Sequence, residues 1–284
     1  MSPDGLLEIP AAFLHEKGVI RLHEEEGTDL YRLAMQLLDG EYPKPFVIDD
    51  GKIRRLHFSL ALVQSEMLIA DPWSLHLAYT REMMAFLLFL PRPRHVVIVG
   101  LGGGSLTKFC YRHLPRTRVT TVELSSDVIA FREQFALPFD DERQAIVCAD
   151  AVEYFATTEE EADVVLLDGY DDNGIVPAFC DERFYAHLHA SLSPRGILVC
   201  NLALRGEDRD AHLDLLSESF DGRVRVLDVA GDGNRIAFAF NDPNFAPDWT
   251  HIRREARALR EATGLAFDSF ARRLADRTRL SRPR

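Results

Sequence analysis

His95-Val-Val-Ile-Val-Gly100-Leu-Gly-Gly-Gly-Ser105 is the stretch that decides the fold of this 284-residue chain. It begins with an apolar, β-branched run, which predicts a buried strand, and it ends in a cluster of glycines. Glycines at the end of a strand let the backbone turn sharply and approach a ligand where a Cβ atom would collide. A segment of helical length and a second apolar run follow, and Glu123 closes that run. The stretch therefore predicts a strand–helix–strand unit that binds a nucleotide.

The chain beyond this unit predicts alternating helices and strands. Helices are expected at 126–135, 151–157, 181–192 and 210–220, and strands at 144–148, 163–167 and 196–200. Two final strands, 223–229 and 235–240, flank a glycine-rich turn and predict an antiparallel hairpin. Five parallel strands closed by such a hairpin predict an α/β fold. They favour the Rossmann-like seven-stranded methyltransferase sheet over a six-stranded dinucleotide-binding sheet.

Three regions are expected along the chain. Residues 1–75 predict a small N-terminal β-hairpin region, because Asp49-Asp50-Gly51 lies between two short strand-like runs. Within that region, 29–38 is either a helix or a strand. Residues 76–245 form the Rossmann-like domain, entered through a helix over 73–90 that stops before Pro91. Residues 246–284 form an arginine-rich tail with helical spacing over 251–280, expected to pack on the body or on a partner.

Composition argues against several classes of protein. The net charge of -12 disfavours non-specific nucleic-acid binding. The longest apolar run falls well short of the roughly 18 residues of a membrane span, so no membrane partner is expected. The chain has 4 cysteines without a Cys-x-x-Cys pair and no secretory signal. These features predict a cytoplasmic protein with reduced thiols and no metal.

Acidic residues end three of the predicted strands. Glu123, Asp150 and Asp168 follow the second, third and fourth strands, and the glycine turn follows the first. Ligands of open α/β sheets bind beyond the carboxyl ends of the strands, so these groups are expected to share a cleft. A single acid in such a place also suits a helix cap. Together they predict an adenosine pocket, with Glu123 on the ribose and Asp150 at the adenine. The expected cofactor-binding residues are Gly100, Gly102, Gly103, Gly104, Glu123, Leu124, Asp150 and Ala151.

The run Asp168-Gly-Tyr-Asp-Asp172 predicts the acceptor side of that cleft. A carboxylate there can attract an ammonium, accept its proton and leave a neutral nucleophile beside a sulfonium carbon. Burial and neighbouring carboxylates raise the pKa of such an acid, which suits a base that works near neutrality. A solvated acidic loop is the alternative, and it fits Asp172 better than Asp168. Since no lysine accompanies the glycine turn, an adenosyl sulfonium is favoured over a phosphate-bearing dinucleotide.

These motifs resemble the spermidine synthase-like aminopropyltransferases, which share the S-adenosylmethionine methyltransferase fold. The resemblance covers roughly residues 60–241. It implies that Asp168 is the catalytic base with Asp171 as a second acid, and that Gln64 touches the donor. It also implies decarboxylated S-adenosylmethionine as donor, a polyamine such as putrescine as acceptor, and a homodimer or higher homo-oligomer. The runs that carry it are Val99–Ser105, Val122–Ile129, Ala149–Tyr154, Leu167–Asp171 and 179–185.

The chain departs from the family in the Asp168 loop, which lacks the family's proline, and at three other positions. Gly103 stands where the family keeps an aspartate that holds the donor's ammonium, and Thr80 stands where it keeps a tyrosine that lines the amine pocket. Tyr79 is adjacent to that second position. Arg81 places a positive charge near the site and could bind a carboxylate, including the one that intact S-adenosylmethionine retains. The expected substrate-binding residues are Tyr170, Asp171, Tyr79 and Arg81.

Three functional hypotheses follow. The leading one is an aminopropyltransferase of polyamine biosynthesis that uses decarboxylated S-adenosylmethionine and a small-molecule amine, and releases methylthioadenosine. The second is an S-adenosylmethionine-dependent methyltransferase of unknown substrate, favoured by Gly103 and Arg81. The third is a non-catalytic protein that keeps the fold and binds an adenosyl ligand.

Overall fold

A seven-stranded sheet forms the centre of the molecule. The computed structural model describes residues 6–171, 174–203, 207–231 and 233–276, without the side chains at 170, 171, 174, 175 and 207. The strand order is β13-β14-β12-β9-β6-β7-β8. β12, β9, β6, β7 and β8 are parallel, and β14 is antiparallel to both β12 and β13. The predicted sheet is confirmed. Its strands are β6 His95–Val99, β7 Arg118–Glu123, β8 Gln144–Cys148, β9 Ala162–Leu167, β12 Leu192–Leu202, β13 Val224–Asp228 and β14 Arg235–Phe240.

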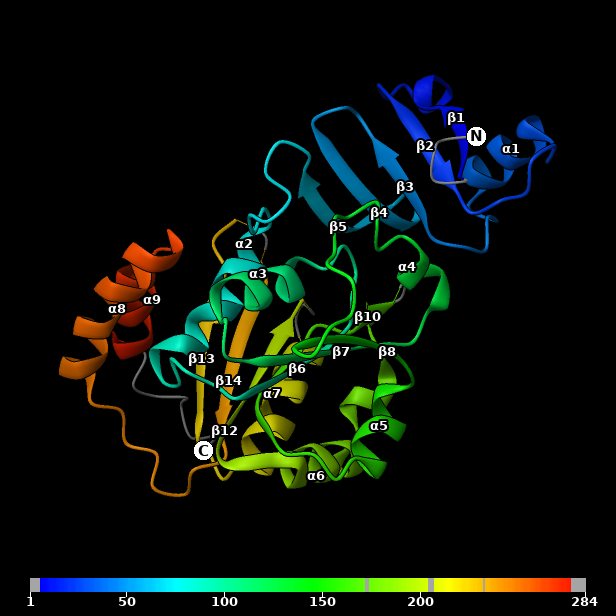
Figure 1. Cartoon of the computed structure of the whole chain (residues 1–284). Helices are drawn as coiled ribbons and strands as arrows, with labels where there is room; N and C mark the ends of the chain where they lie inside the picture. The colour runs from blue at the N-terminus through cyan, green and yellow to red at the C-terminus, as the bar shows by residue number, and fades with distance from the viewer. Residues whose placement is uncertain (1–5, 172–173, 204–206, 232, 277–284) are drawn as a thin grey trace.

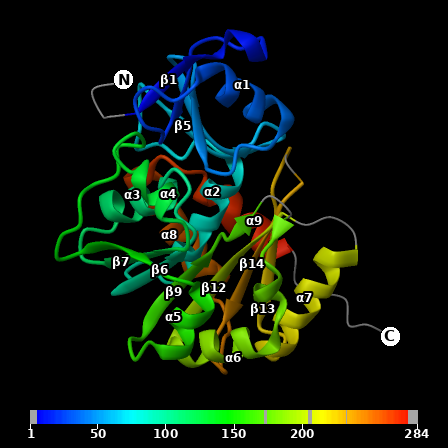
Figure 2. The same ribbon diagram turned by 90° about the vertical axis from the view of Figure 1, so that its right-hand side faces the viewer.

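Helices cover both faces of this sheet, as the two views in Figures 1 and 2 show. Side chains alternate between the faces of a strand, so Val96 and Ile98 of β6 enter one hydrophobic cluster and Val97 and Val99 enter another. Burial on both faces explains why β6 is apolar throughout. The first face carries α3 Ser105–His113, the 3-10 helix η2 Met84–Leu88, α8 Trp249–Thr263 and α9 Phe267–Asp276. The second carries α5 Ala151–Thr157, α6 Glu182–Ser191 and α7 Glu207–Ser219.

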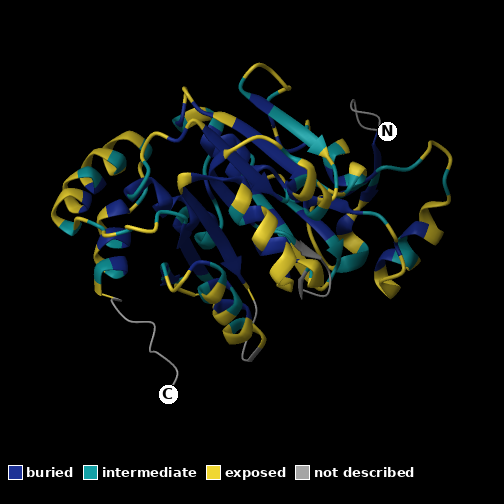
Figure 3. Cartoon of the chain, turned by 90° about the horizontal axis from the view of Figure 1, so that it is seen from below, coloured by how far each residue is buried: buried dark blue, intermediate teal, exposed yellow. Residues whose placement is uncertain are grey.

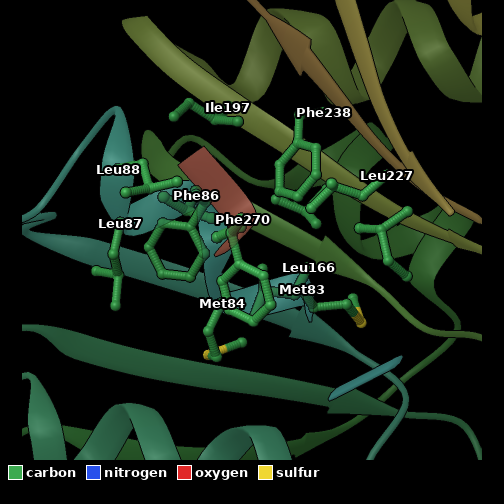
Figure 4. Close-up of a cluster of buried hydrophobic side chains, with 14 of the residues drawn as sticks. Met83, Met84, Phe86, Leu87, Leu88, Leu166, Ile197, Leu227, Phe238 and Phe270 are labelled. Atoms are coloured by element: carbon green, nitrogen blue, oxygen red, sulfur yellow. The ribbon is translucent and has the colours of Figure 1, made fainter. Parts of the chain in front are cut away.

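The C-terminal helices belong to the core of the first face. Figure 4 shows Phe270 of α9 beside Met83, Phe86 and Phe238. The stretch predicted as one helical tail is two helices, because Gly264 takes a left-handed conformation (φ +77°) and ends α8. The regional boundaries at 75 and 245 remain predictions.

An ion pair fixes α9 to α2 Ala78–Met83. The buried Glu82 carboxylate accepts hydrogen bonds from Nη1 and Nη2 of Arg273 at 3.0 and 2.8 Å. Arg273 Nη2 also donates to the carbonyl of Asp228 on β13. This two-point pairing holds α2, whose first turn lines the cleft described below, against the C-terminal helices.

The N-terminal region is a five-stranded antiparallel sheet in the order β1-β2-β3-β4-β5. The hairpin predicted around Asp49-Asp50-Gly51 joins β3 to β4. The segment 29–38, for which both a helix and a strand were considered, forms helix α1, and its Leu33 and Leu37 pack on the sheet. β1 and β2, with 4 residues each, were not predicted, because no Asp-Gly turn marks them as that turn marks β3 and β4. The elements are β1 Leu7–Pro10, η1 Ala11–Leu14, β2 Val19–Leu22, α1 Leu30–Asp39, β3 Phe46–Asp49, β4 Ile53–Ser59 and β5 Leu62–Leu68.

Two predicted helices are shorter than expected. The helix predicted from residue 73 begins only at Ala78, because Ser74 folds back on the carbonyl of Asp71 in a turn. The helix predicted over 126–135 is α4 Ser126–Ala130, after which the chain turns so that Phe131 and Phe135 pack against the N-terminal sheet. Three short elements, β10 Tyr170–Asp171, β11 Gly174–Ile175 and η3 Pro177–Cys180, follow β9.

Burial follows the layers. In Figure 3 the strands of the central sheet are buried and the outer sides of the helices are exposed. None of the helices in the described ranges is long and apolar enough to cross a membrane.

Candidate active site

A cleft of about 420 Å³ lies at the carboxyl ends of the parallel strands. The last residues of β6, β9 and β12, or those just after them, form its floor. Val63, Gln64 and Ser65 of β5 close it from the side of the N-terminal sheet. The predicted residues that line it are Gln64, Tyr79, Gly100, Gly102, Glu123, Leu124, Asp150, Ala151 and Asp168.

Gly100 allows the ends of β6 and β9 to lie close together. Its φ is +89°, and a Cβ atom there would lie 2.4 Å from the carbonyl oxygen of Asp168. The neighbouring backbone is tied by a hydrogen bond from Asp168 N to Val99 O at 3.0 Å. A side chain at residue 100 would push Asp168 away, so the glycine positions the acid as well as the turn.

Glu123 is held by two backbone amides. Its Oε2 accepts from Leu101 N and its Oε1 from Ser125 N, both at 2.8 Å. Each carboxylate oxygen can accept a second hydrogen bond, so the fixed carboxylate remains able to receive the hydroxyls of a ribose. Leu124, which is 68% exposed, stands beside it in the cleft wall.

Asp150 has the helix-cap role considered above as well as a place in the cleft. Its Oδ1 accepts from Val152 N at 2.7 Å and so caps α5. The carboxylate is exposed and lines the cleft next to Ala151. The cap satisfies one oxygen and leaves acceptor capacity for an adenine amino group.

Asp168 is oriented by two side chains that line the cleft. Its Oδ1 accepts from Asn201 Nδ2 at 2.8 Å and its Oδ2 from the hydroxyl of Tyr79 at 3.1 Å. Burial raises the pKa of Asp168, and the hydrogen bonds from Asn201 and Tyr79 act in the opposite direction. The result is a fixed carboxylate with raised basicity at the end of β9, as a base for a cationic amine requires.

Asn201 and Asn234 line the cleft, but they were not predicted from the sequence. Asn201 Oδ1 accepts from Asn234 Nδ2 at 3.1 Å, so the two amides and Asp168 form one hydrogen-bonded chain. Asn201 lies near the end of β12, the fifth parallel strand, so the rule that selected the three acids also points to it. Asn201 was not predicted because its amide is neutral and cannot act as a base, although an amide can orient a carboxylate by donating a hydrogen bond to it.

The remaining predicted site residues either do not line the cleft or have side chains outside the described part of the structure. Arg81 Nη1 donates to the carbonyls of Leu75 and His76, and the described lining of the cleft does not include it. The same holds for Gly103 and Gly104, which lie in the glycine turn beyond the lining. The side chains of Tyr170 and Asp171, and all of Asp172, fall outside the described residues. The substrate-binding roles of Arg81, Tyr170 and Asp171 remain predictions.

Replacing Tyr79 with phenylalanine is expected to lower kcat/KM near neutral pH by about tenfold, the effect of losing one hydrogen bond to a charged group. In the wild type, the hydrogen bond from Tyr79 lowers the pKa of Asp168. Its loss should therefore raise the pKa of Asp168 in the variant. A base works only when ionised, hence the acid limb of the pH–rate profile should move to higher pH. Steady-state rates across pH measure this.

Tyr111→Phe is the matched control, because the Tyr111 hydroxyl also donates to a carboxylate, that of Asp141, but at an exposed position. Its pH–rate profile should coincide with that of the wild type. A Tyr79→Phe profile with an unmoved acid limb would contradict the assigned contact.

No group of three or more His, Cys, Asp or Glu side chains that could hold a metal ion occurs within the described part of the chain.

Comparison with known proteins gives consistent results. The Spermine/spermidine synthase domain matches residues 76–208. The chain is 35% identical to the polyamine aminopropyltransferase of Chromobacterium violaceum over 233 residues, which cover 82% of this chain and 89% of that protein.

Solved structures show the same fold. A probable spermidine synthase from Corynebacterium glutamicum is similar with a TM-score of 0.62 and 19% identity, over 79% of this chain and 92% of that one. Human Methyltransferase-like protein 13 in complex with SAH is similar with a TM-score of 0.57 and 24% identity, over 73% and 94% of the two chains. These two likenesses bear on the fold, and they agree with the methyltransferase-type sheet.

Proposed function

Because the chain belongs to the spermidine synthase family of polyamine aminopropyltransferases, we propose that it transfers an aminopropyl group from decarboxylated S-adenosylmethionine to a small-molecule amine in polyamine biosynthesis. The observation that carries the proposal is the Asp168 carboxylate, held by Tyr79 and Asn201 in the cleft that Glu123 also lines. A base and an adenosine site in one cleft are what such a transfer needs.

The cleft suits an adenosyl donor in size and polarity. Its volume of about 420 Å³ lies within the usual range of small-molecule sites. Glu123 would accept the ribose hydroxyls, and Asp150 with Ala151 would flank the adenine. The glycine turn would then lie beside the sulfonium.

The reaction requires a neutral amine nitrogen next to the sulfonium carbon. Asp168 would attract the acceptor's ammonium and accept a proton from it. The freed nitrogen lone pair then forms a bond to the methylene carbon attached to sulfur. The electron pair of the breaking carbon–sulfur bond passes to sulfur, which becomes neutral as methylthioadenosine leaves. Tyr79 and Asn201 keep the carboxylate in position during these steps.

An assay with decarboxylated S-adenosylmethionine and a panel of diamines tests the proposal. Time-dependent release of methylthioadenosine that requires an amine is the expected result. Absence of methylthioadenosine with every amine would sink the proposal. The cytoplasmic location, the homodimeric or larger assembly and the lack of nucleic-acid or membrane partners stay predictions.

A methyltransferase that uses intact S-adenosylmethionine is the second candidate, and Gly103 favours it. A Cβ atom at Gly103 would lie 2.7 Å from Ser65 Oγ and 2.8 Å from Phe135 Cδ1, so the turn has no room for the family's aspartate in this arrangement. Calorimetry with the two donors separates the candidates. Clear preference for the decarboxylated donor would reject the methyltransferase.

A further inference from the structure

Ser65 of β5 reaches across from the N-terminal sheet to the glycine turn. Its Oγ would lie 2.7 Å from a Cβ atom at Gly103 and 3.6 Å from one at Gly102. The residue lines the cleft, although only 6% of its surface is exposed. The hydroxyl therefore occupies the space into which a side chain at residue 103 would otherwise project.

The Ser65 hydroxyl has no hydrogen-bond partner among the described residues. Two other hydroxyls of the cleft are used locally: Thr80 Oγ1 donates to Leu77 O at 2.7 Å, and Ser125 Oγ accepts from Val128 N at 3.2 Å. The hydroxyl of Ser105, which also lines the cleft, has no partner among the described residues either. The Ser65 hydroxyl is not fully buried, so water or a ligand in the cleft can take the hydrogen bond that the protein leaves open. An unpaired hydroxyl that faces a ligand cleft points to a partner in the ligand.

Phe135 also occupies the space beside Gly103. The ring of this buried residue would lie 2.8 Å from a Cβ atom at Gly103. Its carbonyl accepts a hydrogen bond from Lys108 Nζ at 2.6 Å, which fixes the backbone behind the ring. Of the side-chain atoms that would lie nearest to a Cβ at Gly103, Ser65 Oγ is the polar one.

We propose that the Ser65 hydroxyl binds the polar end of the donor's aliphatic chain, whether that end is an ammonium alone or also carries a carboxylate. The inference rests on the proposed function, since it assumes an adenosyl-sulfonium donor in the cleft. A hydroxyl can accept a hydrogen bond from an ammonium and can donate one to a carboxylate. It therefore discriminates between the decarboxylated and the intact donor less than a carboxylate would.

Calorimetric titration of the wild type and of Ser65→Ala with three compounds tests this assignment. The compounds are decarboxylated S-adenosylmethionine, S-adenosylmethionine and methylthioadenosine, which lacks the aliphatic chain and the positive charge on sulfur. Ser65→Ala should bind the first two about tenfold more weakly, the effect of one hydrogen bond to a charged group. Its affinity for methylthioadenosine should stay within about twofold of the wild type.

Ser59→Ala on the neighbouring strand β4 is the matched control, since Ser59 does not appear in the described lining of the cleft. It should bind all three compounds like the wild type. Ser105→Ala supplies a competing assignment, because Ser105 follows the turn and also lines the cleft. Loss of donor affinity in Ser105→Ala but not in Ser65→Ala would overturn the proposal.

Ser65→Asp gives a second readout. A carboxylate at this place attracts the ammonium and repels the carboxylate of the intact donor, so preference for the decarboxylated donor should rise at least about tenfold. Unchanged preference would count against Ser65. Equal weakening for all three compounds in Ser65→Ala would reveal a purely structural role and overturn the proposal. Wild-type protein that binds none of them would instead contradict the proposed function itself.

Discussion

Asp168→Asn is expected to lower kcat by about 10²- to 10⁴-fold, the usual contribution of a positioned general base. The amide has nearly the same shape, and its oxygen can still accept the hydrogen bond that Asn201 donates to Asp168 Oδ1 at 2.8 Å. It cannot take a proton from an ammonium. Donor affinity and thermal stability should therefore stay close to those of the wild type while turnover is lost. Rates of methylthioadenosine release and donor titrations measure the two quantities.

Asp210→Asn is the matched control for this variant. Asp210 is an exposed acid that pairs with Arg235 Nη1 at 3.4 Å, and exposed pairs contribute little to stability. It should retain wild-type kcat. An Asp168→Asn protein with more than about a fifth of the wild-type kcat would rule out a base at this position. A measured rate that is lost in Asp168→Asn would also exclude the non-catalytic hypothesis.

Lys108→Met is expected to remove a large part of the pH dependence of stability. Lys108 is 1% exposed, and burial lowers its pKa from 10.5 to about 7. Its Nζ donates to Phe135 O at 2.6 Å and to Met67 Sδ at 3.3 Å. Between pH 7 and 10.5 the unfolded chain binds this proton and the folded chain does not, so the stability of the wild type rises with pH across that window.

The size of the effect follows from the same shift. At about 1.4 kcal/mol per pKa unit, the wild type should gain about 4 kcal/mol relative to Lys108→Met between pH 6 and pH 10. Denaturant unfolding of both proteins at several pH values gives this difference. Lys52→Met, at an exposed loop position, is the control and should follow the wild type at every pH. Parallel stability curves for the wild type and Lys108→Met would show that the lysine titrates normally.

The elements that the sequence predicted best are those with the strongest local pattern. The strand over 144–148 and the helix over 151–157 have the bounds of β8 and α5. The first is a short apolar run with turn signals on both sides, and the second begins directly after Asp150, its cap. β1 and β2 were not predicted, because no tight turn joins either of them to its neighbour; β2 pairs with β3, which is distant in sequence, and β1 pairs with β2.

The three acids that line the cleft could be predicted from a single rule about where parallel strands end. Glu123, Asp150 and Asp168 were found together, because each follows a parallel strand and parallel strands end at the same edge of the sheet. The pairing of Asn201 with Asn234 could not be seen, since it depends on the antiparallel register that sets Leu202 opposite Arg235. Tyr79 was predicted as a substrate-binding residue because it is adjacent to Thr80, where the family keeps a tyrosine. The structure brings the Tyr79 hydroxyl to Asp168, because α2 begins only after a turn that sequence periodicity does not reveal.

The two residues of the ion pair between Glu82 and Arg273 are synthesised at different times. They are 191 positions apart in the chain. A ribosome that adds about 5–20 residues per second makes Glu82 about 10–40 s before it makes Arg273. Throughout that interval the helix that carries Tyr79 holds a carboxylate whose partner does not yet exist. The nascent protein therefore acquires the contact that fixes α2, and with it the setting of Asp168, only after all of the parallel strands have been synthesised.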